Sequence, residues 1–382
     1  MTESRPFRVL SLDGGGMRGT YTATYLERVA ATFAQRRKLD SLDVGKGVDL
    51  IVGTSTGAII GCALAAGKPL SQVVSLYRKH GSRIFSKKLP AGLFGVAPDL
   101  LARKLALEAG ETELLAALVE TLGEETVAEV YERRGIALAV SAVEMSQHRS
   151  WVFKTPHFAG TNHRDDKYRL ADVCLASSAA PLYRSLAAID QPDGGEGKPF
   201  NVFADGGLWA NNPVLLGLIE ALDVAEAGRD IQVFSLGTCP VPQGEQIARG
   251  DRHRGLSEWK FGGNAASLSV DAQEFAFDHM ARKLTKHVNR KCTIVRFPHD
   301  KVPATLVPYL GLDDTREEAI NALVTQARTD ADMTNSKCAY RSTDPEAELI
   351  CSLFESAPAL EEPPAARRDR GTSTPRPPAK PR

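Results

Sequence analysis

The sequence predicts an α/β protein in which helices cover both faces of a central, mainly parallel sheet. Along its 382 residues, short apolar runs typical of buried strands alternate with helical runs, as expected for parallel strands joined by helical crossovers. The chain is also 43% hydrophobic, which is enough to bury a sizeable core at this length. The predicted strands span residues 7–13, 50–54, 136–144, 151–154, 200–205, 231–237 and 292–297.

The first strand ends in a glycine-rich loop, Asp13–Gly19 (DGGGMRG), which leads into a helix over about residues 20–36. Successive glycines at a helix N-terminus let backbone N–H groups converge on one point, where the helix dipole also favours negative charge. The loop therefore predicts an anion hole. The anion could be the oxyanion of an acyl intermediate, or a phosphate, because the loop also matches the dinucleotide fingerprint at Gly14, Gly16 and Gly19. A purely structural turn is the third interpretation.

The second strand leads into the pentapeptide GTSTG, in which Gly53 and Gly57 flank Ser55. A strand, a Gly-x-Ser-x-Gly turn and a helix form a nucleophile elbow, which exposes the serine hydroxyl above the sheet. The glycines are needed because this tight turn leaves no room for side chains beside the nucleophile. Ser55 is therefore the predicted nucleophile, although small-residue turns in α/β proteins also match this motif by chance.

Residues 69–135 interrupt the alternation of strands and helices, because they are mainly helical. We expect them to form a helical insertion beside the site that contains Ser55. Within it, Leu89, Leu93, Phe94 and Val96 follow two lysines, a pattern that suits a lid or a membrane contact. An ordinary pair of core helices joined by a loop fits this stretch equally well.

An acid, Asp205, ends the strand at residues 200–205 and is followed by Gly206 and Gly207. Such an acid faces the crevice at the carboxyl edge of the sheet. Alone, an Asp-Gly pair more often marks a turn, but beside a serine elbow and an anion hole it is a candidate base that accepts the proton of the serine.

A catalytic triad in the order Ser-Asp-His would need a histidine after Asp205, and His279 and His287 qualify by position. Both lie in a predicted amphipathic helix, where a surface or packing role is more common. A dyad of Ser55 and Asp205 therefore fits the motifs better than a triad.

In this order, the three motifs resemble the signature blocks of patatin-like phospholipases. A fourth stretch, Ala176–Pro181 (ASSAAP), resembles the small-residue block of that family between the serine and the aspartate. The resemblance covers about residues 7–215. It implies a serine acyl hydrolase with Ser55 as nucleophile and Asp205 as proton acceptor. It also implies an oxyanion hole, formed by Gly14, Gly15, Gly16 and Arg18.

Three more stretches resemble bacterial patatin-like effectors of cyclic-nucleotide (CBASS) antiphage systems, namely Arg8–Asp13, Tyr77–Phe85 and Leu312–Asp314. In that subgroup, a cyclic dinucleotide switches on degradation of the phospholipids of the bacterium's own membrane. The resemblance implies an activator of the cyclic GMP–AMP type, a membrane phospholipid substrate, and transient contact with the inner membrane surface. Neither the positional nor the headgroup preference follows from it, nor does the oligomeric state.

Composition limits the partners. Lys plus Arg and Asp plus Glu both number 47, so no net field attracts nucleic acid. The six cysteines are scattered, and no carboxylate cluster or histidine pair has metal-ligand spacing, so we expect neither a disulfide nor a metal or other cofactor. The N-terminus lacks a signal pattern and no apolar run has transmembrane length, which predicts a soluble cytoplasmic protein.

Residues 1–357 are expected to form one patatin-like domain. From Pro358 onward, prolines alternate with arginines, which predicts a disordered tail over residues 358–382. Its cations could contact anionic lipid, or the tail could simply be solvated.

Two other functions fit parts of the sequence. One is a nucleotide-binding module that uses the loop Gly14–Gly19, and the other is an esterase for soluble substrates with a Ser-His-Asp triad.

Overall fold

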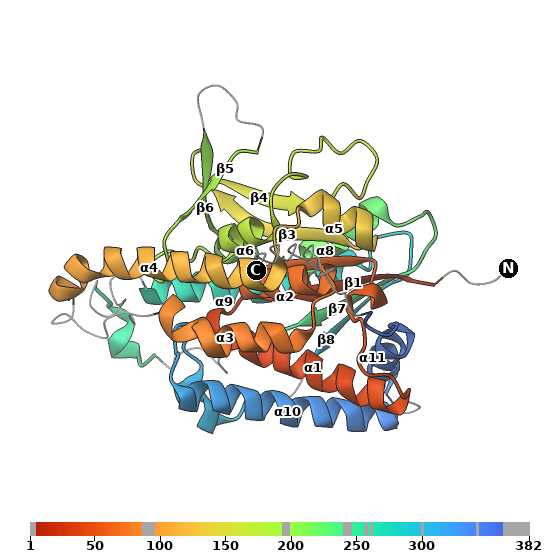
Figure 1. Cartoon of the computed structure of the whole chain (residues 1–382). Coiled ribbons are helices and arrows are strands. Elements are labelled where there is room, and N and C mark those ends of the chain that lie inside the picture. Colours follow the sequence, from red (N-terminus) through yellow and green to blue (C-terminus); the bar gives the residue numbers. More distant parts are fainter. Residues whose placement is uncertain are drawn as a thin grey trace, which may run out of the picture.

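The computed structural model describes residues 5–85, 96–192, 199–239, 247–255, 259, 263–298, 302–340 and 344–361. An eight-stranded sheet lies at the centre of this part of the chain (Figure 1). Its strands are β1 (Phe7–Leu12), β2 (Leu50–Thr54), β3 (Ala137–Glu144), β4 (Arg149–Lys154), β5 (Ala187–Asp190), β6 (Phe200–Asp205), β7 (Ile231–Leu236) and β8 (Cys292–Phe297). The strand order is β5-β6-β3-β2-β1-β7-β8, and β4 also pairs with β3.

The sheet is mainly parallel, as predicted. β3, β2, β1, β7 and β8 pair in parallel, whereas β4, β5 and β6 join by antiparallel pairing. Side chains alternate between the faces: in β1, Phe7 and Val9 contact one core cluster, and Leu10 and Leu12 contact the other. The predicted strands are confirmed to within two residues at their ends. β5 was not predicted, because its four residues carry only two buried positions.

Helices cover both faces of the sheet, which confirms the predicted fold class. α8 and α9 cover one face. α1, α2 and α6 cover the other, α3 packs on α1 and α2, and α10 packs along the outer side of α1 (Figure 1). The α-helices are α1 (Gly19–Arg36), α2 (Thr56–Ala65), α3 (Leu70–Ile84), α4 (Val96–Leu122), α5 (Val127–Arg134), α6 (Leu170–Ser177), α7 (Gly207–Ala210), α8 (Val214–Val224), α9 (Gly263–Leu284), α10 (Glu317–Ala339) and α11 (Pro345–Ser356).

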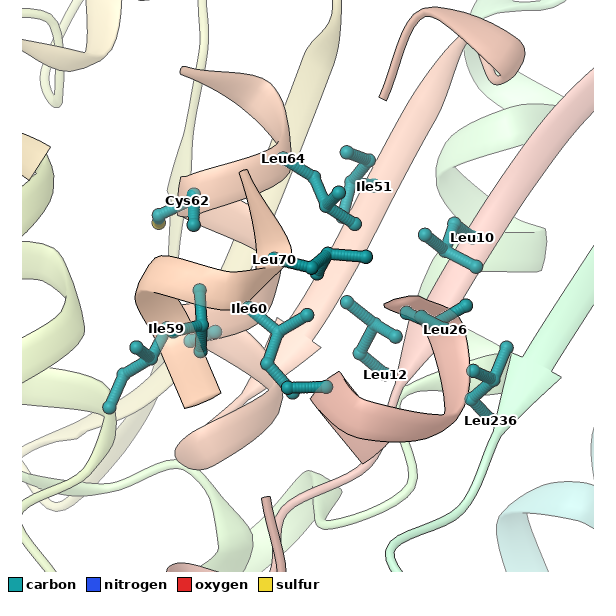
Figure 2. Packing of buried hydrophobic residues seen from close by; sticks show 14 of the residues in the cluster. Leu10, Leu12, Leu26, Ile51, Ile59, Ile60, Cys62, Leu64, Leu70 and Leu236 are labelled. Atoms are coloured by element: carbon teal, nitrogen blue, oxygen red, sulfur yellow. The ribbon is translucent and has the colours of Figure 1, made fainter. Parts of the chain in front are cut away.

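The core between the sheet and α2 holds the serine motif in place. Leu12 of β1 and Ile51 of β2 lie against Ile60 and Leu64 of α2 (Figure 2). All ten residues of α2 are buried, so the helix that begins directly after Ser55 is fixed on every side. Shortening one such side chain typically costs about 2–5 kcal/mol of stability, which indicates how firmly the elbow is anchored.

The predicted insertion contains three helices, α3, α4 and α5, between β2 and β3. α3 packs on α1, and α4 packs on α3 and α6. Residues 86–95, which include Leu89, Leu93 and Phe94 of the predicted lid, lie outside the described residues. Within the described residues, no helix combines the length and the hydropathy that a membrane span needs.

The chain keeps contact with the body of the protein beyond the predicted domain end at residue 357. The Asp43 N–H donates a hydrogen bond to the Pro358 carbonyl (2.8 Å), and the Leu360 N–H donates to the Ser41 carbonyl (3.0 Å). The folded body therefore extends to at least Leu360, because these backbone pairs bind the segment to the loop after α1. Residues 362–382 of the predicted tail lie outside the described residues.

Candidate active site

The register of three strands brings Ser55 and Asp205 together. β2 runs along one edge of β3 and ends with Thr54 opposite Ser141. β6 approaches the same edge from the opposite direction and ends with Asp205 opposite Ala142, while β4 occupies the other edge. The two strands therefore meet end to end. The acid thus reaches the crevice at the carboxyl end of β2 on an antiparallel strand, a direction that the sequence did not indicate.

Ser55 has the backbone conformation of a nucleophile elbow. Its φ of 54° and ψ of −119° lie in a region that non-glycine residues rarely adopt. A Cβ at Gly57 would lie 2.7 Å from the Asp13 carbonyl oxygen, so only glycine fits there. The Ser55 N–H donates to the hydroxyl of Ser177 at 2.8 Å, at the end of α6. This hydrogen bond shows what the small-residue stretch contributes to the turn.

Asp205 is buried and contacts the serine directly. The Ser55 hydroxyl donates to Asp205 Oδ2 at 2.8 Å, and the Gly207 N–H donates to Oδ1 at 2.6 Å. Burial raises the pKa of Asp205 to about 6, although these two hydrogen bonds and the nearby Arg184 act in the opposite direction. Both carboxylate oxygens are therefore already engaged, one of them by Ser55.

The glycine loop lies against the serine and offers two unused donors. A Cβ on Gly14 would be 3.4 Å from the Cβ of Ser55. The Gly14 N–H donates to the Asn211 carbonyl at 2.9 Å, so it fixes the loop. In the part of the chain that the structure describes, the N–H groups of Gly15 and Gly16 donate to no acceptor, and both glycines line the same cavity as Ser55. The N–H groups that could donate to an oxyanion are therefore those of Gly15 and Gly16, and not that of Gly14.

Arg18 lies at the end of this loop and is buried. Its Nε donates to the Gly15 carbonyl at 3.4 Å, and it lines the cavity. Burial lowers the pKa of Arg18, while nearby Glu274 and Asp271 favour its charged form. Arg18 therefore adds positive potential and ties the loop to the start of α1.

A group of charged residues supports the glycine loop from α9 and β8. Asp13 forms an ion pair with Arg296 at 2.5 Å. Glu274 of α9 accepts a hydrogen bond from Asn211 Nδ2, and burial together with the charge of Asp13 raises the pKa of Glu274 to about 7. Because Asn211 also holds Gly14, these contacts link α9 to the loop.

The sequence analysis missed several of these supporting residues. Asn211, Arg184 and Glu274 were not predicted, and neither was Thr238, whose hydroxyl donates to the Gly14 carbonyl at 3.0 Å. The pair Asn211-Asn212 soon after Asp205 was a usable signal, because short polar side chains after a glycine turn often bond to the backbone. Glu274 lies in an ordinary helical stretch that carried no signal.

A cavity of about 620 Å³ opens above Ser55 and Asp205. One wall is apolar and comes largely from α3, α4 and the segment before α10; it includes Ile59, Ile84, Phe85, Leu114, Leu310 and Leu312. Three further lining residues, Leu182, Leu208 and Val307, are 40–50% exposed. Apolar side chains thus form one wall of the cavity and part of its solvent-exposed lining.

Neither histidine of the alternative triad reaches this cavity. His279 is exposed on α9 and stacks on Phe275 with ring centroids 6.3 Å apart, and His287 is exposed just after the helix. No histidine among the described residues lines the cavity. The geometry therefore favours the dyad over the Ser-His-Asp triad.

Comparison with known proteins places the chain in a family. The model of the family described as "Patatin-like phospholipase" matches residues 10–218. A cGAMP-activated phospholipase of Pseudomonas aeruginosa is 33% identical over 287 residues, which cover 74% of this chain and 77% of that protein. Another, from Vibrio cholerae, is 33% identical, with 60% and 64% covered. A cUMP-AMP-activated phospholipase of Escherichia coli is 28% identical, with 62% and 66% covered.

The family match spans the glycine loop, the serine elbow and the Asp-Gly-Gly motif, so the resemblance drawn from these motifs is confirmed. The relatives extend the likeness beyond the motifs to most of the chain. The chain belongs to the patatin-like phospholipases, a family of hydrolases that cleave acyl esters of lipids.

Proposed function

We propose that this protein is a phospholipase A-type acyl hydrolase that uses a dyad of Ser55 and Asp205. The observation that carries this proposal is the 2.8 Å hydrogen bond between the two side chains, in a cavity also lined by Gly15 and Gly16. A nucleophile, a base and an anion hole are the three parts that acyl transfer requires.

In the proposed reaction, Ser55 Oγ attacks the ester carbonyl carbon and its proton passes to Asp205. The N–H groups of Gly15 and Gly16 donate to the oxygen that becomes negative in the tetrahedral intermediate. The carbon–oxygen bond to the leaving group then breaks, and the lysophospholipid leaves with the proton. Water, deprotonated by Asp205, attacks the acyl-serine; the bond between the acyl carbon and Ser55 Oγ breaks, Asp205 returns the proton to Oγ, and the fatty acid is released.

The environment of Asp205 suits this role. A carboxylate of ordinary pKa is a weak base, and general-base catalysis is most effective when the pKa lies near the working pH. Burial raises the pKa of Asp205 to about 6, so the carboxylate is a stronger base than usual and still ionised at neutral pH.

The apolar cavity supports a lipid substrate. The wall formed by residues such as Ile59 and Leu114 can cover an acyl chain, because burying CH₂ groups is favourable by about 0.8 kcal/mol each. The exposed Leu182, Leu208 and Val307 lie where a lipid would enter. We propose that the substrate is membrane phospholipid, reached at the inner surface of the bacterial membrane.

We further propose that a cyclic dinucleotide activates the enzyme. The support is the similarity to proteins named cGAMP-activated and cUMP-AMP-activated phospholipases. The two names specify different nucleotides. They therefore support activation by some cyclic dinucleotide more strongly than activation by one particular cyclic dinucleotide. We propose cyclic GMP–AMP, since the more similar relatives carry that name.

Two measurements on the purified protein test the proposed chemistry. With phospholipid vesicles and a cyclic dinucleotide, it should release fatty acid and lysophospholipid in equal amounts, measured by mass spectrometry. A fluorophosphonate probe should modify Ser55, identified in the tryptic peptide. A protein that binds nucleotide, fails to react with the probe and leaves the lipid intact would instead be the nucleotide-binding module.

The rate should depend on pH through Asp205. Only the ionised carboxylate accepts a proton, so activity should fall about tenfold per pH unit well below a midpoint near 6. The measurement is kcat/KM for a short-chain ester from pH 4.5 to 9. Glu274, with a pKa raised to about 7, also titrates in this range, so Glu274→Gln is the matched control and should keep the midpoint near 6. A pH profile of kcat/KM with its midpoint near 4 would contradict the assignment of this titration to Asp205. So would a profile whose midpoint near 6 is lost in Glu274→Gln.

A further inference from the structure

Arg184 is a buried cation that forms no ion pair with any residue the structure describes. It lies just after the small-residue stretch, is 7% exposed, and lines the cavity that holds Ser55. Among the described residues, its guanidinium forms no ion pair, and its buried Nε has no hydrogen-bond acceptor. Buried arginines are normally paired, because removing the charge from water is costly. Arg184 therefore has donor groups that no described residue accepts from.

The described acids near Arg184 accept no hydrogen bond from its guanidinium. Asp205 acts on its charge only at a distance, and its carboxylate oxygens accept from Ser55 and Gly207. Glu111 likewise contributes only at longer range. The guanidinium carbon lies 5.8 Å from the ring centroid of Phe85, on the apolar wall. Burial lowers the pKa of Arg184 to about 10, so the side chain still carries its charge at neutral pH.

Arg18, the other cation on this cavity, is placed differently. Its Nε donates to the Gly15 carbonyl, whereas Glu274 and Asp271 act on its charge only at a distance. Arg18 is thus part of the loop that surrounds the reacting carbonyl. Arg184 lies outside this loop, in the segment that follows α6, the helix whose Ser177 accepts a hydrogen bond from the Ser55 N–H.

We propose that Arg184 binds the phosphodiester anion of the glycerophospholipid whose ester is attacked by Ser55; this inference rests on the proposed function. The planar guanidinium donates two parallel hydrogen bonds to phosphate oxygens, which supplies the missing partner. A neutral lipid with the same acyl chains lacks that anion and leaves Arg184 buried and unpaired. Arg184 therefore selects phospholipids over diacylglycerols.

The test compares two substrates with identical acyl chains, phosphatidylethanolamine and diacylglycerol, in mixed micelles of an uncharged detergent. The full-length protein is assayed at pH 8, well above the pKa of Asp205, with cyclic GMP–AMP present. Arg184→Gln should lower kcat/KM for the phospholipid at least about tenfold more than for diacylglycerol, the order expected for a charge-assisted contact. Arg184→Lys keeps the charge but lacks the planar guanidinium that donates two parallel hydrogen bonds. Its loss of kcat/KM for the phospholipid, relative to diacylglycerol, should therefore lie between those of the wild type and Arg184→Gln. Arg83→Gln, which removes an exposed arginine of α3 that pairs with Glu113, should leave the ratio unchanged.

An equal loss on both substrates, or no loss on either, would overturn the proposal. If Arg184→Gln unfolds, Arg184→Lys alone decides by the same ratio. Arg184 could instead bind a second anion, the carboxylate of the fatty-acid product, and inhibition by oleate distinguishes this case. If oleate inhibits Arg184→Gln more weakly than the wild type while the ratio of the two substrates is unchanged, the arginine binds the product and the proposal is overturned. Activity of Ser55→Ala on either lipid would instead refute the dyad, whatever the result for Arg184.

Discussion

Replacing Ser55 with alanine should lower the hydrolysis of phospholipids and of short-chain esters by at least about 10³-fold. The loss is large because no other described side chain hydrogen-bonds to Asp205 within the cavity, and removal of a nucleophile typically has an effect of this order. The initial rate of fatty-acid release measures it. A Ser55→Ala variant that keeps more than a tenth of the wild-type rate would refute the nucleophile assignment.

Asp205→Asn should cause a loss of the same order, because a dyad fails when either member is lost. Thermal melting shows whether this variant is folded, because the substitution should lower the activity without lowering the stability. Burial raises the pKa of Asp205 to about 6, above the value of about 3.9 in an unfolded chain. The contribution of this carboxyl to stability is therefore present below pH 4 and is lost as the pH rises through 6. At pH 8 the asparagine variant should melt no lower than the wild type. An inactive variant that also melts far below the wild type would mean that the activity loss reports unfolding.

Cyclic GMP–AMP should raise the phospholipase activity of nucleotide-free protein by well over tenfold, and by up to about 100-fold. An enzyme that cleaves the phospholipids of its own cell, as proposed above, must be largely inactive without its signal. A shift from ~1% to ~99% active protein needs about 10⁴-fold tighter binding to the active state, or about 5.5 kcal/mol. The measurement is fatty-acid release across a panel of cyclic di- and trinucleotides.

α3 and α4 are the elements that we expect the nucleotide to affect, because they supply Tyr77, Ile84 and Leu114 to the cavity wall. Ser55→Ala is the matched control: it should bind the nucleotide with unchanged affinity in calorimetry while remaining inactive. Full activity of nucleotide-free protein, unchanged by every cyclic nucleotide of the panel, would remove the regulatory proposal and leave the hydrolase intact.

The local chemistry of the site could be predicted from the sequence because it depends on short-range sterics. Gly57 must be glycine because a side chain there would meet the backbone at the end of β1, and such a constraint is written in the motif itself. The alternation of Phe7, Val9, Leu10 and Leu12 between the faces of β1 likewise follows from the pleat of a strand. These local rules predicted the fold class, the serine and the glycine loop.

The contacts between distant segments could be decided only by the tertiary structure. Asp205 meets Ser55 because β2 and β6 end against adjacent residues of β3, and no local pattern shows that β6 is antiparallel. The Gly14 N–H is occupied by Asn211, 197 residues away, so the sequence could not tell which glycines keep free donors. Arg184 likewise lies near Phe85, a residue about 100 positions earlier that directly follows α3. Local backbone geometry thus determined which residues can react, and long-range packing decided which of them meet and how their charges are balanced.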